Sequence, residues 1–276
     1  MSIITAVFLG AIQGLTEFLP VSSSGHLVLF QKIFGIEDTN WYPADTLLFD
    51  TMLHVGTLVG VFAVLWKDIW AILRKLFQPL TLYLIIATIP AVIFAFAFRK
   101  PLEQAFESGQ FLGLCFLITS ALLVTAELLS KRAVKGTLKK DGEMNWLDAL
   151  VIGIMQAVAI VPGVSRSGAT LSGALSRGLD RSFAARFSFL LSIPAILGAA
   201  VLQFKDVFKG GSPTANSGIG TAAIIAGTLS AAIVGFFAVR LMLKIVKEKS
   251  LWGFAIYTGV LGLLVLLDQY VLHLVF

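Results

Sequence analysis

The sequence has little charge and almost no cysteine. Only 13% of its 276 residues are charged, whereas 57% are hydrophobic and the mean hydropathy is +0.90. These values exclude an ordinary soluble domain and indicate an integral membrane protein. The single cysteine, Cys115, excludes an internal disulfide and a metal site built from several cysteines. We interpret Cys115 as a small buried hydrophobic residue.

No polar stretch is long enough for a second, soluble domain, and the apolar runs alternate with short charged connectors. The first run has no cationic segment ahead of it and no small-residue cleavage site behind it, so it does not resemble a signal peptide. A bilayer core of about 30 Å takes roughly 20 apolar helical residues. The longer runs therefore predict six transmembrane helices, near residues 47–66, 82–98, 110–129, 184–202, 219–240 and 252–273.

An internal repeat surrounds two short polar segments. A shift of 143 positions aligns Gly10 with Gly153, Gln13 with Gln156, Val21 with Val164, Ser22 with Ser165, Ser24 with Ser167, and Gly25 with Gly168. The copies differ where chemistry is expected, since Glu17 aligns with Ile160, Ser23 with Arg166, and His26 with Ala169. One copy therefore carries an acid, a hydroxyl and an imidazole, and the other carries a cation.

Each polar segment interrupts an apolar stretch at a proline. The stretches 3–34 and 147–177 break at Pro20 and Pro162, and the pieces on either side are too short to span a bilayer. We therefore expect two re-entrant helical hairpins, which membranes tolerate only where protein or water surrounds the backbone. A hairpin followed by three transmembrane helices gives the two halves opposite orientations. The predicted fold is one all-α integral membrane domain, 1–276, with an inverted repeat of halves 1–135 and 136–276.

The distribution of Lys and Arg gives an orientation. If both termini face outward, fifteen of the 21 Lys and Arg residues lie on inner connectors, five lie on outer ones, and Arg166 lies within the membrane. The asymmetry also explains the pI of about 9.4 by orientation and attraction to membrane lipids, with no need for a nucleic-acid partner. In this orientation the first hairpin opens outward, the second opens inward, and their tips meet at mid-depth.

The two hairpin tips have the composition of an anion site. An arginine near the bilayer centre costs roughly 2.5 to 3.5 kcal/mol on insertion scales, so Arg166 needs an anionic partner, either Glu17 or a ligand. After Pro20 and after Pro162 a serine-rich turn opens a helix, whose free N–H groups favour an anion. Phosphate or diphosphate suits such a site, because a guanidinium binds two of its oxygens at once. An Arg166–Glu17 pair that merely orders the fold is the structural alternative.

Hydroxyl and imidazole groups gather at the first tip. Ser22, Ser23 and Ser24 can each act as a helix N-cap, but three in a row exceed what capping requires. Ser23 and His26 lie on one helix face, so they supply a hydroxyl nucleophile and a group to move its proton. Glu17 would orient either group or hold a metal ion. The alternative for His26 is a purely structural hydrogen bond.

Asp50 and His54 are weaker candidates for lining the site. They are four residues apart at the start of a predicted span and therefore share one helix face. Hydrogen bonds to neighbouring residues explain them equally well.

At these residues the sequence resembles a known family, the bacterial undecaprenyl-diphosphate phosphatases, also called the bacitracin-resistance family. The resemblance rests on two motifs, QGLTEFLPVSSSGH at 13–26 and PGVSRSGAT at 162–170, and extends over essentially the whole chain. It implies a multi-pass hydrolase of the bacterial plasma (inner) membrane, which removes one phosphate from the C55 polyprenyl diphosphate carrier at the outer face. The reaction recycles the carrier for peptidoglycan synthesis, and thus serves cell-wall biogenesis, cell shape and antibiotic resistance.

The resemblance also implies roles for individual residues. The family's catalytic set falls on Glu17, Ser22, Ser23, His26, Ser165, Arg166, Ser167 and Thr170. Of these we expect catalysis from Glu17, Ser23, His26 and Arg166, and phosphate binding from Ser22, Ser24, Gly25, Ser165, Ser167, Gly168 and Thr170.

In the expected reaction Ser23 attacks the terminal phosphorus, Glu17 and His26 handle its proton, and Arg166 clamps the phosphate oxygens. Water then hydrolyses the phosphoserine. Direct attack by water, or a phosphohistidine on His26, would use the same residues in other roles.

One departure from the family concerns a divalent cation, Mg²⁺ or Ca²⁺, which stimulates its members. They often have two glutamates four residues apart, whereas the first of these positions is Gln13 here. A metal site would therefore have one ligand charge fewer, with Glu17 as its best ligand and Gln13 as a residue that lines the site. The expected partners are a polyprenyl diphosphate and membrane lipids, and a homodimer is compatible with the sequence.

A protein of another class would share much of this plan. Inverted repeats with broken helices that meet at the midplane are also typical of secondary transporters. A polyprenyl-phosphate flippase or an anion transporter is therefore the alternative function. Such a transporter needs the anion site, but it does not need a serine and a histidine beside that site.

Overall fold

The structure, a computed structural model, describes residues 1–36, 43–98, 101, 109–132, 138–209 and 219–276. Its helices are α1 (Ile3–Thr16), α2 (Ser23–Ile33), α3 (Pro43–Val64), α4 (Trp66–Arg74), α5 (Pro79–Ala97), α7 (Leu112–Arg132), α8 (Trp146–Val158), α9 (Arg166–Ser176), α10 (Arg181–Lys209), α11 (Thr221–Glu248) and α12 (Trp252–Leu267), followed by a π-helical turn, Asp268–Leu272. The all-α prediction is confirmed for these residues. The expected boundary between the repeats, at residue 135, lies outside them.

Six helices are long and apolar enough to cross a membrane, namely α3, α5, α7, α10, α11 and α12. They coincide with the six predicted spans to within a few residues, except that α10 and α11 each continue several residues further toward the C-terminus. Large apolar side chains remain exposed along them, as expected of surfaces that face lipid. The chain is therefore a multi-pass membrane protein.

Helix α4 was not predicted. The span expected at 47–66 ends at Val64, because the backbone leaves the helical region at Leu65 and a separate short helix begins at Trp66. In α4 the stacked rings of Trp66 and Trp70 are exposed, with their centroids 5.5 Å apart, while Asp68 pairs with Arg186 of α10. The break lies inside the apolar run Val61–Trp66, just before Lys67 and Asp68, so the hydropathy pattern did not reveal it.

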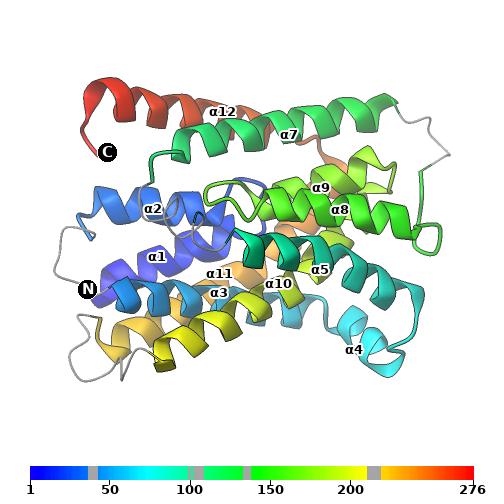
Figure 1. The fold of residues 1–276 in the computed structure, drawn as a ribbon, viewed down its shortest axis with the longest axis horizontal. Coiled ribbons are helices and arrows are strands. Elements are labelled where there is room, and N and C mark those ends of the chain that lie inside the picture. The colour runs from blue at the N-terminus through cyan, green and yellow to red at the C-terminus, as the bar shows by residue number, and fades with distance from the viewer. Residues whose placement is uncertain (37–42, 99–100, 102–108, 133–137, 210–218) are drawn as a thin grey trace.

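Two helical hairpins occupy opposite ends of the molecule. The hairpin of α1 and α2 lies in the half that carries both chain termini, and the hairpin of α8 and α9 lies in the other half (Figure 1). Helices α2 and α9 begin at Ser23 and Arg166, three and four residues after the prolines at which we expected the breaks. The reason is capping, since Ser22 and Ser165 each accept the backbone N–H of the residue three positions later.

Each hairpin packs closely against a transmembrane helix at a glycine. A Cβ atom on Gly10 of α1 would lie only 2.2 Å from the carbonyl oxygen of Gly227 in α11, and a Cβ on Gly153 of α8 would lie 2.6 Å from that of Ala87 in α5. Gly10 and Gly153 are aligned by the internal repeat, so the two copies use the same device. Such small-residue contacts replace the hydrophobic effect, which does not drive helix association in lipid.

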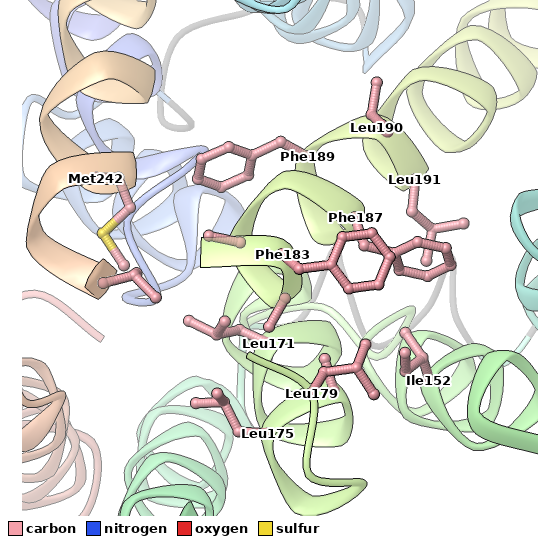
Figure 2. Close-up of a cluster of buried hydrophobic side chains, with 14 of the residues drawn as sticks. Ile152, Leu171, Leu175, Leu179, Phe183, Phe187, Phe189, Leu190, Leu191 and Met242 are labelled. Carbon is pink, nitrogen blue, oxygen red and sulfur yellow. The ribbon is translucent and has the colours of Figure 1, made fainter. Parts of the chain in front are cut away.

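The main hydrophobic cluster includes the contact between the second hairpin and α10. Phe183, Phe187 and Leu191 of α10 lie close to Leu171 of α9 and Ile152 of α8 (Figure 2). The cluster continues to the first tip, where Phe18 packs edge-to-face on Phe189 at 5.5 Å between ring centroids. Helix α10 therefore supports both tips from one side.

Candidate catalytic site at the hairpin tips

The tips of the two hairpins contact each other directly. The backbone N–H of Gly163 donates to Ser24 Oγ at 3.3 Å, and Ser167 Oγ donates to the carbonyl oxygen of Leu19 at 2.9 Å. Residues that are 139 and 148 positions apart in the chain are thus brought together.

Arg166 and Glu17 form an ion pair across this contact. The guanidinium Nη2 of Arg166 donates to Glu17 Oε1, and the two side chains are 19% and 4% exposed. A pair so shielded from solvent loses much hydration, which only good geometry and further hydrogen bonds offset. The anionic partner that the sequence required for Arg166 is therefore Glu17 in this structure. About a fifth of the Arg166 side chain stays exposed beside this pair.

Ser23 bonds to the other oxygen of the same carboxylate. Ser23 Oγ donates to Glu17 Oε2 at 2.6 Å, and Gln13 Nε2 donates to that oxygen at 2.8 Å. A hydroxyl and a carboxylate that could accept its proton are thus in hydrogen-bond contact. A nucleophile beside a base, with the base held by a third group, is the arrangement that activates a serine.

His54 is the histidine that faces this carboxylate. Its Nε2 lies 3.6 Å from Glu17 Oε2, while its Nδ1 donates to the backbone oxygen of Asp50 at 2.8 Å. The side chain is 31% exposed. The carboxylate of Asp50 accepts instead from Gln31 at 2.9 Å. Of the two weaker candidates, His54 therefore reaches the site with its side chain, and Asp50 holds His54 through its backbone.

His26 lies elsewhere at the tip. Its Nδ1 is 2.7 Å from the backbone oxygen of Ser22, and its Nε2 is 2.8 Å from the hydroxyl of Tyr257. Neither bond is to Ser23, although the two residues are neighbours on α2.

The remaining hydroxyl groups mostly support the two turns. Ser165 Oγ lies 3.2 Å from Ser167 Oγ, and the backbone N–H of Ser165 donates to Thr119 at 3.0 Å. Thr170 donates to the carbonyl oxygen of Arg166 at 2.9 Å and lies 2.6 Å from Ser188 Oγ. These bonds orient the backbone that carries the guanidinium.

Glycine is required beside the capping serine Ser22. A Cβ on Gly25 would lie 2.8 Å from the ring of Phe116. A Cβ on Gly168 would lie 3.1 Å from Ser165, its own capping serine. Both glycines let a helix start close against its neighbours with its N–H groups directed at the tip.

The described residues do not by themselves make a divalent cation site. They contain no group of three or more His, Cys, Asp or Glu side chains that could hold a metal ion. Both oxygens of Glu17 already accept hydrogen bonds, and Gln13 contributes a neutral amide whose Oε1 is buried without a partner. A cation here would need most of its oxygen ligands from a bound phosphate.

Three residues that shape the tips were missed by sequence reasoning. Tyr257, Thr119 and Ser188 lie in apolar transmembrane helices and contact tip residues that are 231, 46 and 18 positions away. The only signal of these residues in the sequence is a polar side chain within an apolar span. That signal is not specific, because the hydroxyl of Thr125 also lies in such a span and only donates to a carbonyl oxygen of its own helix.

The fold and the tips together define a multi-pass membrane protein with a buried acid, hydroxyl and guanidinium site shared by two opposed hairpins. The chain belongs to the family described as bacitracin resistance protein BacA, which matches residues 6–264. It is 44% identical over 269 residues to an undecaprenyl-diphosphatase of Carboxydothermus hydrogenoformans, with 98% of each chain covered. It is also 44% identical to undecaprenyl-diphosphatase 4 of Bacillus thuringiensis subsp. konkukian over 98% of each chain, and 36% identical to an undecaprenyl-diphosphatase of Methanosphaera stadtmanae over 99% of this chain and all of the other.

Proposed function

We propose that the chain hydrolyses undecaprenyl diphosphate to undecaprenyl phosphate and inorganic phosphate, recycling the lipid carrier. The observation that carries this proposal is the 2.6 Å hydrogen bond from Ser23 Oγ to Glu17 Oε2, made while Arg166 holds the other carboxylate oxygen. The printed names of the relatives support the same activity.

In the proposed reaction Ser23 Oγ attacks the terminal phosphorus of the diphosphate, and its proton passes to Glu17 Oε2. The bond from that phosphorus to the bridging oxygen breaks, and the lipid monophosphate leaves. Arg166 and the N–H groups that open α2 and α9 stabilise the charge on the transferring phosphoryl group. Glu17 then gives this proton to the departing monophosphate and is again a carboxylate. Water attacks the phosphoserine and gives a proton to Glu17, the bond from phosphorus to Ser23 Oγ breaks, inorganic phosphate leaves, and Glu17 protonates the Ser23 alkoxide.

The proposed phosphate-binding groups are the residues around the two helix starts. Ser24 and Ser167 bridge the tips, whereas Ser22, Gly25, Ser165, Gly168 and Thr170 shape the turns. Two converging helix N-termini favour an anion between them. A divalent cation, Mg²⁺ or Ca²⁺, would accompany the substrate in this proposal and neutralise phosphate charge, and Glu17 is the residue that would hold it.

We also propose that the two hairpins are re-entrant and that residues 1–135 and 136–276 form an inverted repeat. The packing of α1 on α11 and of its counterpart α8 on α5, each through an aligned glycine, supports this. The excess of Lys and Arg on one side supports a site that opens to the outer face of the bacterial plasma membrane.

The test is phosphate release from a C55 or C15 polyprenyl diphosphate by detergent-purified protein. We expect Ser23→Ala and Arg166→Ala to lower the rate at least about a hundredfold. Ser176→Ala, which loses only a bond within its own helix, and Arg74→Ala on α4 serve as matched controls. Parallel assays with a chelator test the cation.

A wild type that folds and releases no phosphate with any divalent cation would overturn the proposal. In that case a polyprenyl-phosphate flippase or an anion transporter becomes the better hypothesis, because it needs the same anion site.

A further inference from the structure

His26 is enclosed by aromatic rings. Only 3% of the residue is exposed, the ring of Phe116 meets it edge-on at 5.4 Å, and the ring of Tyr257 stacks near it at 5.8 Å between centroids. Tyr257 comes from α12, near the C-terminus, so this contact joins the first hairpin to the far end of the sequence.

The hydrogen bonds of His26 fix its tautomer. A carbonyl oxygen only accepts, so the 2.7 Å bond to Ser22 requires the proton on Nδ1. In the neutral ring Nε2 is then the acceptor, and the Tyr257 hydroxyl donates to it at 2.8 Å. Both nitrogens are therefore engaged, and His26 has no free nitrogen for the Ser23 hydroxyl.

The carbonyl group that His26 holds belongs to a strained residue. Ser22 has φ 72° and ψ 97°, a strained region of backbone conformation that residues other than glycine rarely adopt. Its counterpart in the second hairpin, Ser165, has an ordinary φ of −71°, and the position of His26 is there occupied by Ala169. The strained turn thus occurs in the copy that has the imidazole, directly before the proposed nucleophile Ser23.

We propose that Tyr257 is a positioning residue of this site, which acts through His26 on the Ser22 carbonyl group and so fixes the turn that presents Ser23 to Glu17. The inference rests on the proposed function. Without the phenol, His26 Nε2 loses its partner, so the ring is no longer held in the orientation in which Nδ1 binds the Ser22 carbonyl oxygen. Misplacing a nucleophile by a fraction of an ångström lowers the rate without preventing substrate binding.

A double-mutant cycle on phosphate release tests this route of action. In His26→Asn the amide N–H₂ sits where Nδ1–H was and donates to Ser22 without help from Tyr257. We expect Tyr257→Phe to lower kcat about tenfold, with KM changed less than about twofold and the shape of the pH profile kept. In the His26→Asn background the same change should alter kcat by less than about twofold. Tyr270→Phe, on an exposed residue, is the matched control.

Several results would overturn the inference. Tyr257→Phe with wild-type kcat, or with an equal loss in both backgrounds, would mean that Tyr257 does not act through His26. A folded His26→Asn protein without activity would mean that His26 itself transfers a proton. If the wild type and Tyr270→Phe both release no phosphate, the proposed function fails and not this inference alone.

A spectroscopic measurement keeps the test independent of variant folding. The ¹⁵N chemical shifts of the His26 ring in labelled wild-type protein should report a protonated Nδ1 and a hydrogen-bonded, unprotonated Nε2. The chain has three histidines, so His26→Asn assigns the signal by its loss. An Nε2-protonated ring in the wild type would contradict the proposal.

Discussion

Arg166 and Glu17 pair across the two hairpin tips, although 149 positions separate them in the chain. The first copy of the repeat has the uncharged Ser23 at the position aligned with Arg166. The second copy has the uncharged Ile160 at the position aligned with Glu17. The two hairpins thus supply the acid and the cation of this site separately.

This pairing leads to a prediction that separates stability from catalysis. Removing one partner of a buried ion pair costs about 3 to 5 kcal/mol, because the other charge is left uncompensated. Glu17→Gln and Arg166→Met should therefore each lower the melting temperature in detergent, and the double variant should regain most of the loss. All three should release no phosphate. An active double variant would mean that the pair only orders the fold.

Glycine packing predicts which substitutions the fold tolerates. Gly153→Ala would drive a methyl group to 2.6 Å from the Ala87 carbonyl oxygen, so the α8–α5 contact must open. We expect a loss of about 1 to 3 kcal/mol, seen as a lower melting temperature in detergent. Gly198→Ala in α10, where no atom lies within 4 Å of the added Cβ, should be neutral or stabilising. Equal effects in the two variants would contradict the close approach.

The sequence was sufficient to predict the six membrane spans and the polar residues at the two hairpin tips. The spans could be predicted because bilayer thickness sets their length. The aligned pairs Ser22 with Ser165 and Gly25 with Gly168 marked the starts of the two helices at the tips. The break at Leu65 was missed because apolar residues continue on both sides of it. The bond from Tyr257 to His26 was missed because a contact over 231 positions depends on how α12 packs, which local patterns do not encode.

Asp148 provides the last prediction, at the open end of the second hairpin. Its buried carboxylate accepts from Lys139 at 2.8 Å, from the N–H of Asn145 at 3.1 Å and from Arg177 at 2.9 Å. Burial alone would raise the pKa of Asp148, but these three donors outweigh it and hold the pKa below its ordinary value. The ionised carboxylate of Asp148 therefore stabilises the folded protein fully above the ordinary carboxyl pKa, which is near 4. This stabilisation is lost as the pH falls through the lowered pKa of Asp148. Melting temperatures in detergent should show a gap between wild type and Asp148→Asn at pH 7 that narrows toward pH 3. A gap that stays constant over this range would mean that Asp148 stabilises the hairpin by packing rather than by charge.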